Sequence, residues 1–141
     1  MPWSNSLIMM KFMNTFLKTI LTLVVLAGMP AAVAHHSVAG VFSYDNEFSL
    51  TGIITEVEWI NPHSFVHLEV TDESGTVTKW ELETAPTAFF RKAGVTKAML
   101  LGDGKPVTIT GAAPIDENLK SGWIYRITYS DKHFYQISTS R

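Results

Sequence analysis

An apolar–polar alternation with a period of two runs through residues 48–59 and constrains the fold more than any other feature of the chain. Apolar Ile53 and Val57 fall on one face of this stretch, and Glu56 and Glu58 fall on the other. Such a period is typical of a β-strand that is buried on one side only. We therefore expect a strand here, with the two glutamates on a solvated edge.

The same period recurs after Asn61-Pro62, where proline ends the first strand because it has no amide hydrogen to donate to a sheet. A second strand is predicted from about His63. Its apolar side carries Val66, Leu68 and Val70, and its other side carries His63, Phe65, His67 and Glu69. A turn at residues 73–75 then leads to a third strand over residues 76–83, with Trp80 and Leu82 on the core side.

Residues 85–93 predict a short helix, because Pro86 suits a first helical turn and Gly94 suits a stop. Thr96 is a candidate cap for one further turn through Leu101. The remaining strands are predicted over residues 106–110, 123–129 and 133–138, with a polar loop over residues 111–121. Together these elements predict a mostly β fold, a small antiparallel OB-fold-like barrel of five to six strands with one short helix. A β-sandwich is the alternative.

The first 34 residues have the pattern of an export signal. Basic Lys11 and Lys18 precede an apolar run over residues 20–26, and small Ala32 and Ala34 stand where a signal peptidase requires them. The apolar run is shorter than the ~20 residues that span a bilayer. We therefore expect a helical signal peptide that is cleaved after Ala34, and a periplasmic or secreted protein.

Cleavage there divides the chain into three predicted parts. Residues 1–34 are the signal peptide, residues 35–47 an extended N-terminal arm, and residues 48–141 the OB-like domain. Met10, which is followed by a lysine, is an alternative start to Met1. The mature chain is long enough for one domain with a single core.

The composition of the mature part excludes several classes of function. The chain has no cysteine, which excludes disulfides, thiolate metal sites and cysteine catalysis. All thirteen acidic residues but only nine of the eleven basic residues follow the cut. This acidic balance argues against nucleic acid or an anionic membrane as a partner. Five of the six methionines precede the cut, which disfavours a methionine-rich copper(I) site.

All five histidines follow the predicted cut, namely His35, His36, His63, His67 and His133. Cleavage would give His35 a free α-amine beside its imidazole, and two such nitrogens can chelate a metal ion. Without thiolates, amine and imidazole ligands suit Cu(II), Zn(II) or Ni(II). In a histidine brace, His35 binds through its amine and Nδ1 and a further imidazole completes a T shape. In a competing mode the amine, an amide nitrogen and the imidazole of His36 chelate Cu(II) at the first two residues, and no folded domain is required.

His63 and His67 are alternatives for that further imidazole. Four residues along a strand span about 13 Å at ~3.3 Å each, so the two side chains share one ion only if a bulge at Pro62 shortens the separation. His63 is preferred because Pro62 places it at an irregular strand end. Glu69, on the same face as His67, is a candidate to orient that imidazole. His133 is expected to be a surface residue.

Three functions stay open on these grounds. The first is an exported domain that binds a metal ion, copper(II) above others, with a periplasmic protein as a further partner. The second is a non-enzymatic OB-like interaction module that binds a protein or small ligand on a face with Phe65, Tyr125 and Tyr129. The third and weakest is an oxidative copper enzyme. An enzyme is not supported, because the chain contains no nucleophile elbow, phosphate loop, dinucleotide fingerprint or His-Glu-x-x-His motif.

A set of short motifs runs through the mature chain. The motifs are His35-His36-Ser37, Leu50-Thr51-Gly52, Glu58-Trp59-Ile60-Asn61-Pro62-His63 with His67-Leu68, Trp80-Glu81-Leu82-Glu83, and Gly102-Asp103 with Val107-Thr108-Ile109-Thr110-Gly111. With this set the chain resembles a family of small exported bacterial proteins, the domain of unknown function 6152. The resemblance covers nearly the whole mature chain and implies export, but it implies no activity. The turn over residues 103–106 departs from the family's usual form by one additional residue.

Overall fold

The structure, a computed structural model, describes residues 10–11, 13–19 and 38–138. The chain divides into two compact units, Met1–His35 and His36–Arg141. In the first unit, the described residues 10–11 and 13–19 are helical. Among the described residues, no helix is long and apolar enough to cross a membrane. The predicted cleavage site, His35 and His36 all lie outside the described residues.

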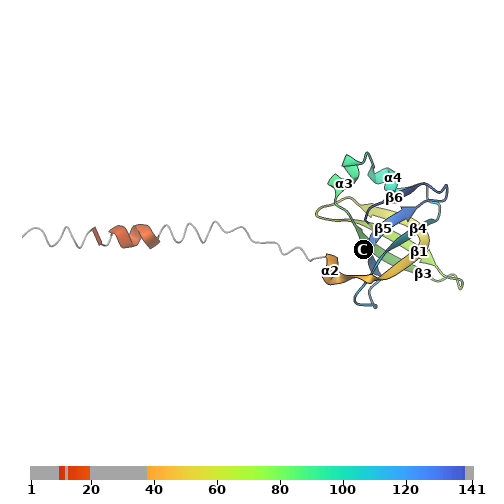
Figure 1. Cartoon of the computed structure of the whole chain (residues 1–141), viewed down its shortest axis with the longest axis horizontal. Helices are drawn as coiled ribbons and strands as arrows, with labels where there is room; N and C mark the ends of the chain where they lie inside the picture. The colour runs from red at the N-terminus through yellow and green to blue at the C-terminus, as the bar shows by residue number, and fades with distance from the viewer. Residues whose placement is uncertain (1–9, 12, 20–37, 139–141) are drawn as a thin grey trace, which may run out of the picture. The chain divides into compact units, whose positions relative to one another are not determined.

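The described part of the second unit consists of short helices and six strands (Figure 1). In chain order they are α2 (Val38–Val41), β1 (Phe42–Glu58), β2 (Ser64–Thr71), β3 (Val77–Thr84), α3 (Thr87–Lys92), α4 (Lys97–Leu101), β4 (Val107–Pro114), β5 (Ser121–Thr128) and β6 (Phe134–Gln136). The helical turn predicted after Thr96 is confirmed as α4, since the Thr96 hydroxyl accepts a hydrogen bond from the amide of Met99 at 3.2 Å.

The six strands form one sheet in the order β3-β2-β1-β4-β5-β6. A further pairing of β3 with β5 closes strands β1 to β5 into a ring, and β6 lies outside the ring against β5. Every neighbouring pair is antiparallel except β3 and β5, which run parallel where Glu81–Glu83 meets Ser121–Trp123. The mostly β, mostly antiparallel fold predicted from the alternation is therefore confirmed, with two short helices rather than one between its third and fourth strands.

The hairpin between β2 and β3 fixes the register of both strands. One carboxylate oxygen of Asp72 accepts hydrogen bonds from the amides of Ser74 and Thr76, each at 2.9 Å. Gly75 adopts a φ of 83°, which favours glycine. Because the hairpin is symmetric about Ser74, residues equally distant from it in sequence face each other across the two strands.

The core lies inside the ring and is built from alternate residues of its strands. Among its fully buried members are Val57, Val66, Leu68, Leu82, Ile109, Ile124 and Ile127. On β1, however, the core residue is Ile54 and not the predicted Ile53. A β-bulge between Ile54 and Glu56 shifts the register against β2, so the simple alternation fails at this point.

Helices α3 and α4 cover one end of the ring (Figure 1). Phe90 of α3 and Leu100 of α4 are fully buried, and the Phe90 ring lies 5.4 Å from the ring of Trp59. The hydroxyl of Tyr129 donates to the carbonyl of Leu100 at 2.7 Å. This end of the ring is therefore closed by apolar packing and by one buried hydrogen bond.

The segment predicted as an extended arm has a different local structure. Val38–Val41 is helical, and β1 already begins at Phe42. Phe42 is buried together with Ala112 and Tyr125 in a second, smaller apolar cluster. Four partly buried residues pack against this cluster, namely Val38, Val41, Tyr44 and Trp123. The start of the described domain is thus anchored on β4 and β5.

Candidate functional site

The turn before β2 determines the position of His63. The Asn61-Pro62 peptide bond is cis, and Ser64, directly after His63, is fully buried. The amide of Ser64 donates to the carbonyl of Ala85 at 3.3 Å, and its hydroxyl donates to the carbonyl of Ile60 at 3.3 Å. These contacts hold His63 at the start of β2, next to the end of β3.

His63 is hydrogen-bonded through Nδ1 to the carboxylate of Glu83 on β3. The Glu83 side chain is only 6% exposed, although its neighbour Leu82 is the residue that faces the core. A buried carboxylate is costly unless it is paired and hydrogen-bonded, and His63 supplies that partner. With Nδ1 donating to the carboxylate, the lone pair of the His63 ring is on Nε2.

This contact has the form that metal-binding histidines usually show. A histidine that binds a metal through one ring nitrogen almost always donates its other ring N–H to a carboxylate, a carbonyl or water. The carboxylate fixes the tautomer and the ring orientation and makes the remaining nitrogen more basic. Of the two predicted alternatives, His63 has the more buried carboxylate partner, since Glu83 is 6% exposed and the partner of His67, Glu58, is 40% exposed.

Trp123 connects His63 with both ends of the described domain. Its ring meets the His63 ring edge-on, with the centroids 5.2 Å apart. Its indole N–H donates to the hydroxyl of Ser138, the last described residue, at 3.2 Å. Trp123 also packs against the same small apolar cluster as Val38, the first residue of α2. Trp123 therefore joins His63, the last described residue and the cluster that anchors the start of the domain.

His67 lies on the same side of β2 as predicted, but in a different local environment. Its Nε2 is 2.8 Å from a carboxylate oxygen of Glu58, and the side chains are 27% and 40% exposed. Its direct neighbours across the sheet are Glu56 on β1 and Glu81 on β3. The structure corrects the roles predicted for two nearby glutamates, Glu69 and Glu58.

Glu69, predicted to orient His67, instead lies 3.4 Å from the ammonium of Lys79. Glu58, predicted to be solvated, is the residue that contacts His67. The reason is again the β-bulge on β1, because it brings Glu58 diagonally onto His67 while Glu56 stands directly opposite.

The structure does not bring the predicted metal ligands together within its described part. His63 and His67 have separate carboxylate partners. No group of three or more histidine, aspartate or glutamate side chains that could hold a metal ion occurs among the described residues. His35 and His36, which carry the predicted amine and imidazole donors, lie outside the described residues, so the complete ligand set stays a prediction.

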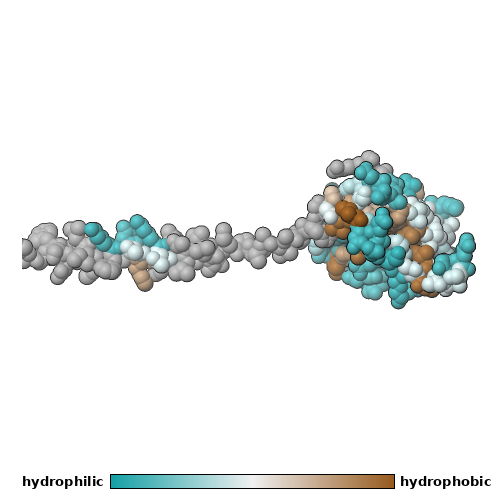
Figure 2. Space-filling view, turned by 90° about the horizontal axis from the view of Figure 1, so that it is seen from below, coloured by the Kyte–Doolittle hydropathy of each residue, from teal (hydrophilic) through white to brown (hydrophobic). Residues whose placement is uncertain are grey.

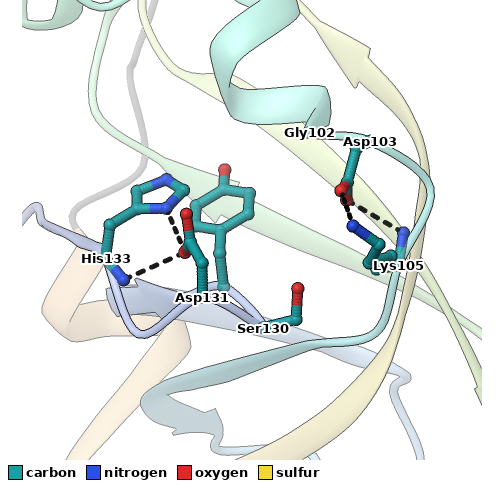
Figure 3. Close-up of a pocket in the computed structure, with 7 residues that line it drawn as sticks. Gly102, Asp103, Lys105, Ser130, Asp131 and His133 are labelled. Carbon is teal, nitrogen blue, oxygen red and sulfur yellow. Dashed lines mark hydrogen bonds and ion pairs between the residues drawn. The ribbon is translucent and has the colours of Figure 1, made fainter.

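His133 lies in the turn before β6, on the wall of a hollow of about 290 Å³ (Figure 3). Its ring stacks on Tyr129 with the centroids 4.3 Å apart, and its Nδ1 is 2.5 Å from a carboxylate oxygen of Asp131. This hydrogen bond holds the pKa of Asp131 below its ordinary value. Across the hollow, Asp103 is 2.5 Å from the ammonium of Lys105. The carboxylates of Asp131 and Asp103 thus each have a partner within their own turn.

The aromatic residues predicted to form a ligand-binding face are largely inside the domain. Tyr125 and Tyr129 are buried, and Phe65 is half-buried. The alternation places Phe65 correctly on the outer side of β2. Tyr125 lies at a bulge in β5 and is buried against Phe42. These three side chains do not form an exposed aromatic face.

Glu83 is the residue that the sequence interpretation missed. The signal was present, because a hairpin symmetric about Ser74 places Phe65 opposite Glu83 and His67 opposite Glu81. Both glutamates would then lie on the histidine side of the sheet. What the sequence does not indicate is that Glu83, unlike Glu81, is covered where β3 meets β5.

The comparisons with known proteins agree with the motifs quoted above. A family model described as "Family of unknown function (DUF6152)" matches residues 23–122. The chain belongs to this family. Within the DUF6152 match lie His35, His36, His63, His67 and Glu83. Neither a curated protein nor a solved structure matches the chain.

Proposed function

We propose that this DUF6152 protein is an exported copper(II)-binding domain. In this proposal, cleavage after Ala34 exposes the amine of His35, which binds the ion together with its own imidazole. His63 supplies the third nitrogen through Nε2, and Glu83 holds the His63 ring. His67 and His36 are the alternative donors.

The observation that carries this proposal is the hydrogen bond between His63 Nδ1 and the buried carboxylate of Glu83. A buried carboxylate that holds one ring nitrogen prepares the other nitrogen to bind a metal ion. The partner of His67, Glu58, is 40% exposed and therefore constrains its histidine less. The geometry of the described residues thus favours His63 over His67.

The connection between His35 and the described domain is short. Only His36 and Ser37 separate His35 from Val38, and three extended residues span about 10 Å. Val38 packs against the same cluster as Trp123, whose ring contacts His63. The proposal therefore requires these three residues to bring the amine of His35 from Val38 to His63.

Copper(II) is the proposed ion because the available donors are all nitrogens. Nitrogen and oxygen sites bind Cu(II) more tightly than the other divalent ions of the first transition series. The mature chain has no thiolate and only Met99 as a thioether. Its excess of acidic residues also favours a cation over an anion. A bound Cu(II) would be held for storage or delivery.

The experiment compares protein that begins at His35 with protein that carries one additional alanine before His35. Cu(II) is titrated into each, and electron paramagnetic resonance reports the nitrogen ligands. We expect the extended protein to bind at least 100-fold more weakly and to show a different spectrum, because an acylated nitrogen is a poor donor. Equal affinity and equal spectra would contradict the proposed role of the amine.

Three further variants separate the alternative donors. His63→Ala should change the spectrum and weaken binding, while His67→Ala should leave both as in the parent protein. If neither variant has an effect and His36→Ala abolishes the signal, the terminus alone chelates the metal and His63 has no part. The predicted export is checked by mass spectrometry of the periplasmic fraction, where a chain that begins at a residue other than His35 would contradict the proposed cleavage.

A further inference from the structure

Helices α3 and α4 and the turn between them form a helical cap, residues 88–101, on one end of the ring (Figure 1). Three buried side chains hold the helical cap from inside, namely Phe90, Val95 and Leu100. The amides of the turn already have partners, since Gly94 donates to the carbonyl of Arg91 and Val95 to that of Phe90. Every other residue of the helical cap is exposed.

The exposed residues of the helical cap are basic, apolar or small. The basic ones are Arg91, Lys92 and Lys97. Three large apolar side chains are between 37% and 44% exposed, namely Phe89, Met99 and Leu101. The others are alanine, glycine and Thr96, whose hydroxyl already accepts from the amide of Met99. A partner that excludes water from this surface would therefore bury no carboxylate or side-chain amide that lacks a hydrogen-bond partner.

The charge of the helical cap is opposite to that of the rest of the domain. Residues 84–102 contain three basic residues and no acidic residue, so all thirteen acidic residues of the chain lie outside them. None of the three bases forms an ion pair within the described part of the chain. Asp103, the first acidic residue after the helical cap, is paired with Lys105. The helical cap therefore presents positive charge that no neighbouring carboxylate neutralises.

The opposite face of the domain differs from the helical cap. Seen from below, away from α3 and α4, it is hydrophilic over much of its area and has separate hydrophobic patches (Figure 2). At physiological ionic strength charges act over about 8 Å, so a surface that contacts the helical cap meets the charge of the helical cap first. The acidic balance of the whole chain argues against an anionic membrane as a partner, but it does not describe this end of the domain.

We propose that the helical cap binds the surface of an anionic lipid bilayer. Its ammonium and guanidinium groups contact lipid phosphates, and Phe89, Met99 and Leu101 enter the apolar region below the headgroups. Such a bilayer is the occupant that offers negative charge above an apolar layer. A soluble anion would leave the three apolar side chains in water, and a nucleic acid would stack on Phe89 alone. The proposal does not rest on the proposed copper site.

The test measures how the protein sediments with lipid vesicles. Protein purified from cells that express the full-length chain is mixed with vesicles of phosphatidylcholine alone or of an equal mixture of phosphatidylcholine and phosphatidylglycerol. We expect at least tenfold tighter binding to the anionic vesicles, and weaker binding as salt is added. Equal binding to both kinds of vesicle would overturn the proposal. Complete displacement by inorganic phosphate or by duplex DNA at the same phosphate concentration would also overturn it, since phosphate alone would then be recognised.

A matched pair of triple variants isolates the charge of the helical cap. The first variant removes its three positive charges, Arg91→Gln/Lys92→Gln/Lys97→Gln. The control removes three exposed positive charges elsewhere, Lys79→Gln/Lys120→Gln/Lys132→Gln. We expect the first variant to bind anionic vesicles at least tenfold more weakly than the parent protein, and the control to bind less than threefold more weakly. Equal weakening in both would mean that only the net charge attracts the protein, which contradicts a defined surface.

A second matched pair tests the apolar part of the contact. Met99→Ser/Leu101→Ser removes two exposed apolar side chains from the helical cap, and the control, Ile115→Ser/Leu119→Ser, removes two from the loop before β5. The variant in the helical cap should bind anionic vesicles at least threefold more weakly, and the control should bind as the parent protein does. An unchanged midpoint of thermal unfolding shows that both are folded. Equal binding by the two folded variants would contradict the entry of apolar side chains into the bilayer.

Discussion

At the scale of single residues, the contact between Glu83 and His63 is the most informative in the domain. Glu83 is a buried carboxylate on the outer side of the sheet, where its strand neighbour Leu82 already faces the core. Its burial costs free energy that only a charged or donating partner offsets. His63 is such a partner, and this explains why a carboxylate occupies a buried position.

Replacing Glu83 by glutamine tests its part in metal binding. The Glu83→Gln variant retains the shape of the side chain but loses the charge of the carboxylate that holds the His63 ring through Nδ1. We expect its Cu(II) affinity to fall at least tenfold, since the loss of an outer carboxylate costs that much in known metal sites. Isothermal titration of the protein that begins at His35 measures the change. The control is Glu58→Gln beside His67, and an equal loss there would contradict the choice of His63.

Tyr129 illustrates a residue whose buried hydroxyl affects stability rather than binding. Its oxygen donates to Leu100 at 2.7 Å, and burial raises its pKa above the ordinary value of 10.0. In the unfolded chain the same hydroxyl ionises near pH 10. Above that pH the unfolded state binds fewer protons than the folded state, so the free energy of unfolding falls as pH rises.

We therefore expect the free energy of unfolding to decline above about pH 10 in the parent protein and to decline less in Tyr129→Phe. The variant should also lose about 1–2 kcal/mol near neutral pH, because the buried carbonyl of Leu100 loses its donor. Urea unfolding between pH 8 and pH 11 measures both effects. Tyr135→Phe leaves the buried hydroxyl in place and should retain most of the decline, because burial is the larger cause of the raised pKa of Tyr129. An identical decline in Tyr129→Phe would refute the explanation.

At the scale of elements, the close packing of β4, β5 and β1 depends on glycine. An ideal Cβ atom at Gly111 would lie 2.1 Å from the carbonyl oxygen of Trp123 and 2.9 Å from the ring of Phe48. The carbonyl belongs to the backbone of the paired strand and cannot move without disturbing the ladder. Gly111 therefore sets the approach of β4 to β5 beside Trp123.

The Gly111→Ala variant should lose about 2 kcal/mol or more of stability, because overpacking at a rigid backbone contact costs on the order of 1–3 kcal/mol. Chemical unfolding followed by tryptophan fluorescence measures the change. As a control, an alanine at Gly75 meets nothing within 4 Å and suffers only from the φ of 83°, so it should cost about 1 kcal/mol. A smaller effect at Gly111 than at Gly75 would be inconsistent with the packing described.

The elements themselves could largely be predicted from the sequence. Alternation predicted β2 and β3 within a residue or so of their bounds, and Thr96 predicted the start of α4. The long β1 and the end of β4 were missed, because Phe42–Glu47 and Gly111–Pro114 have no clear period of their own. These segments are strands because they pair with each other across 65 to 72 residues of chain. Local sequence does not contain that information.

At the scale of the whole molecule, the candidate site depends on several strands at once. The outer position of His63 and His67 follows from the period of β2 alone, and it was predicted. The burial of Glu83 follows from the closure of the ring, where β3 meets β5, and it was not predicted. The contacts of Trp123 with the small apolar cluster and with Ser138 likewise require β1, β4, β5 and the residues after β6. Contacts of this kind are set by topology rather than by spacing.

The closure of the ring is also its shortest ladder, in which Glu81–Glu83 meets Ser121–Trp123. A short ladder has few hydrogen bonds to break, so we expect local opening of the ring to begin there. The residue pair at the end of this ladder, Glu83 and Trp123, is also the pair that contacts His63. Local opening of the ring at this ladder would separate Glu83 from Trp123, so the position of the His63 imidazole depends on the closure of the ring.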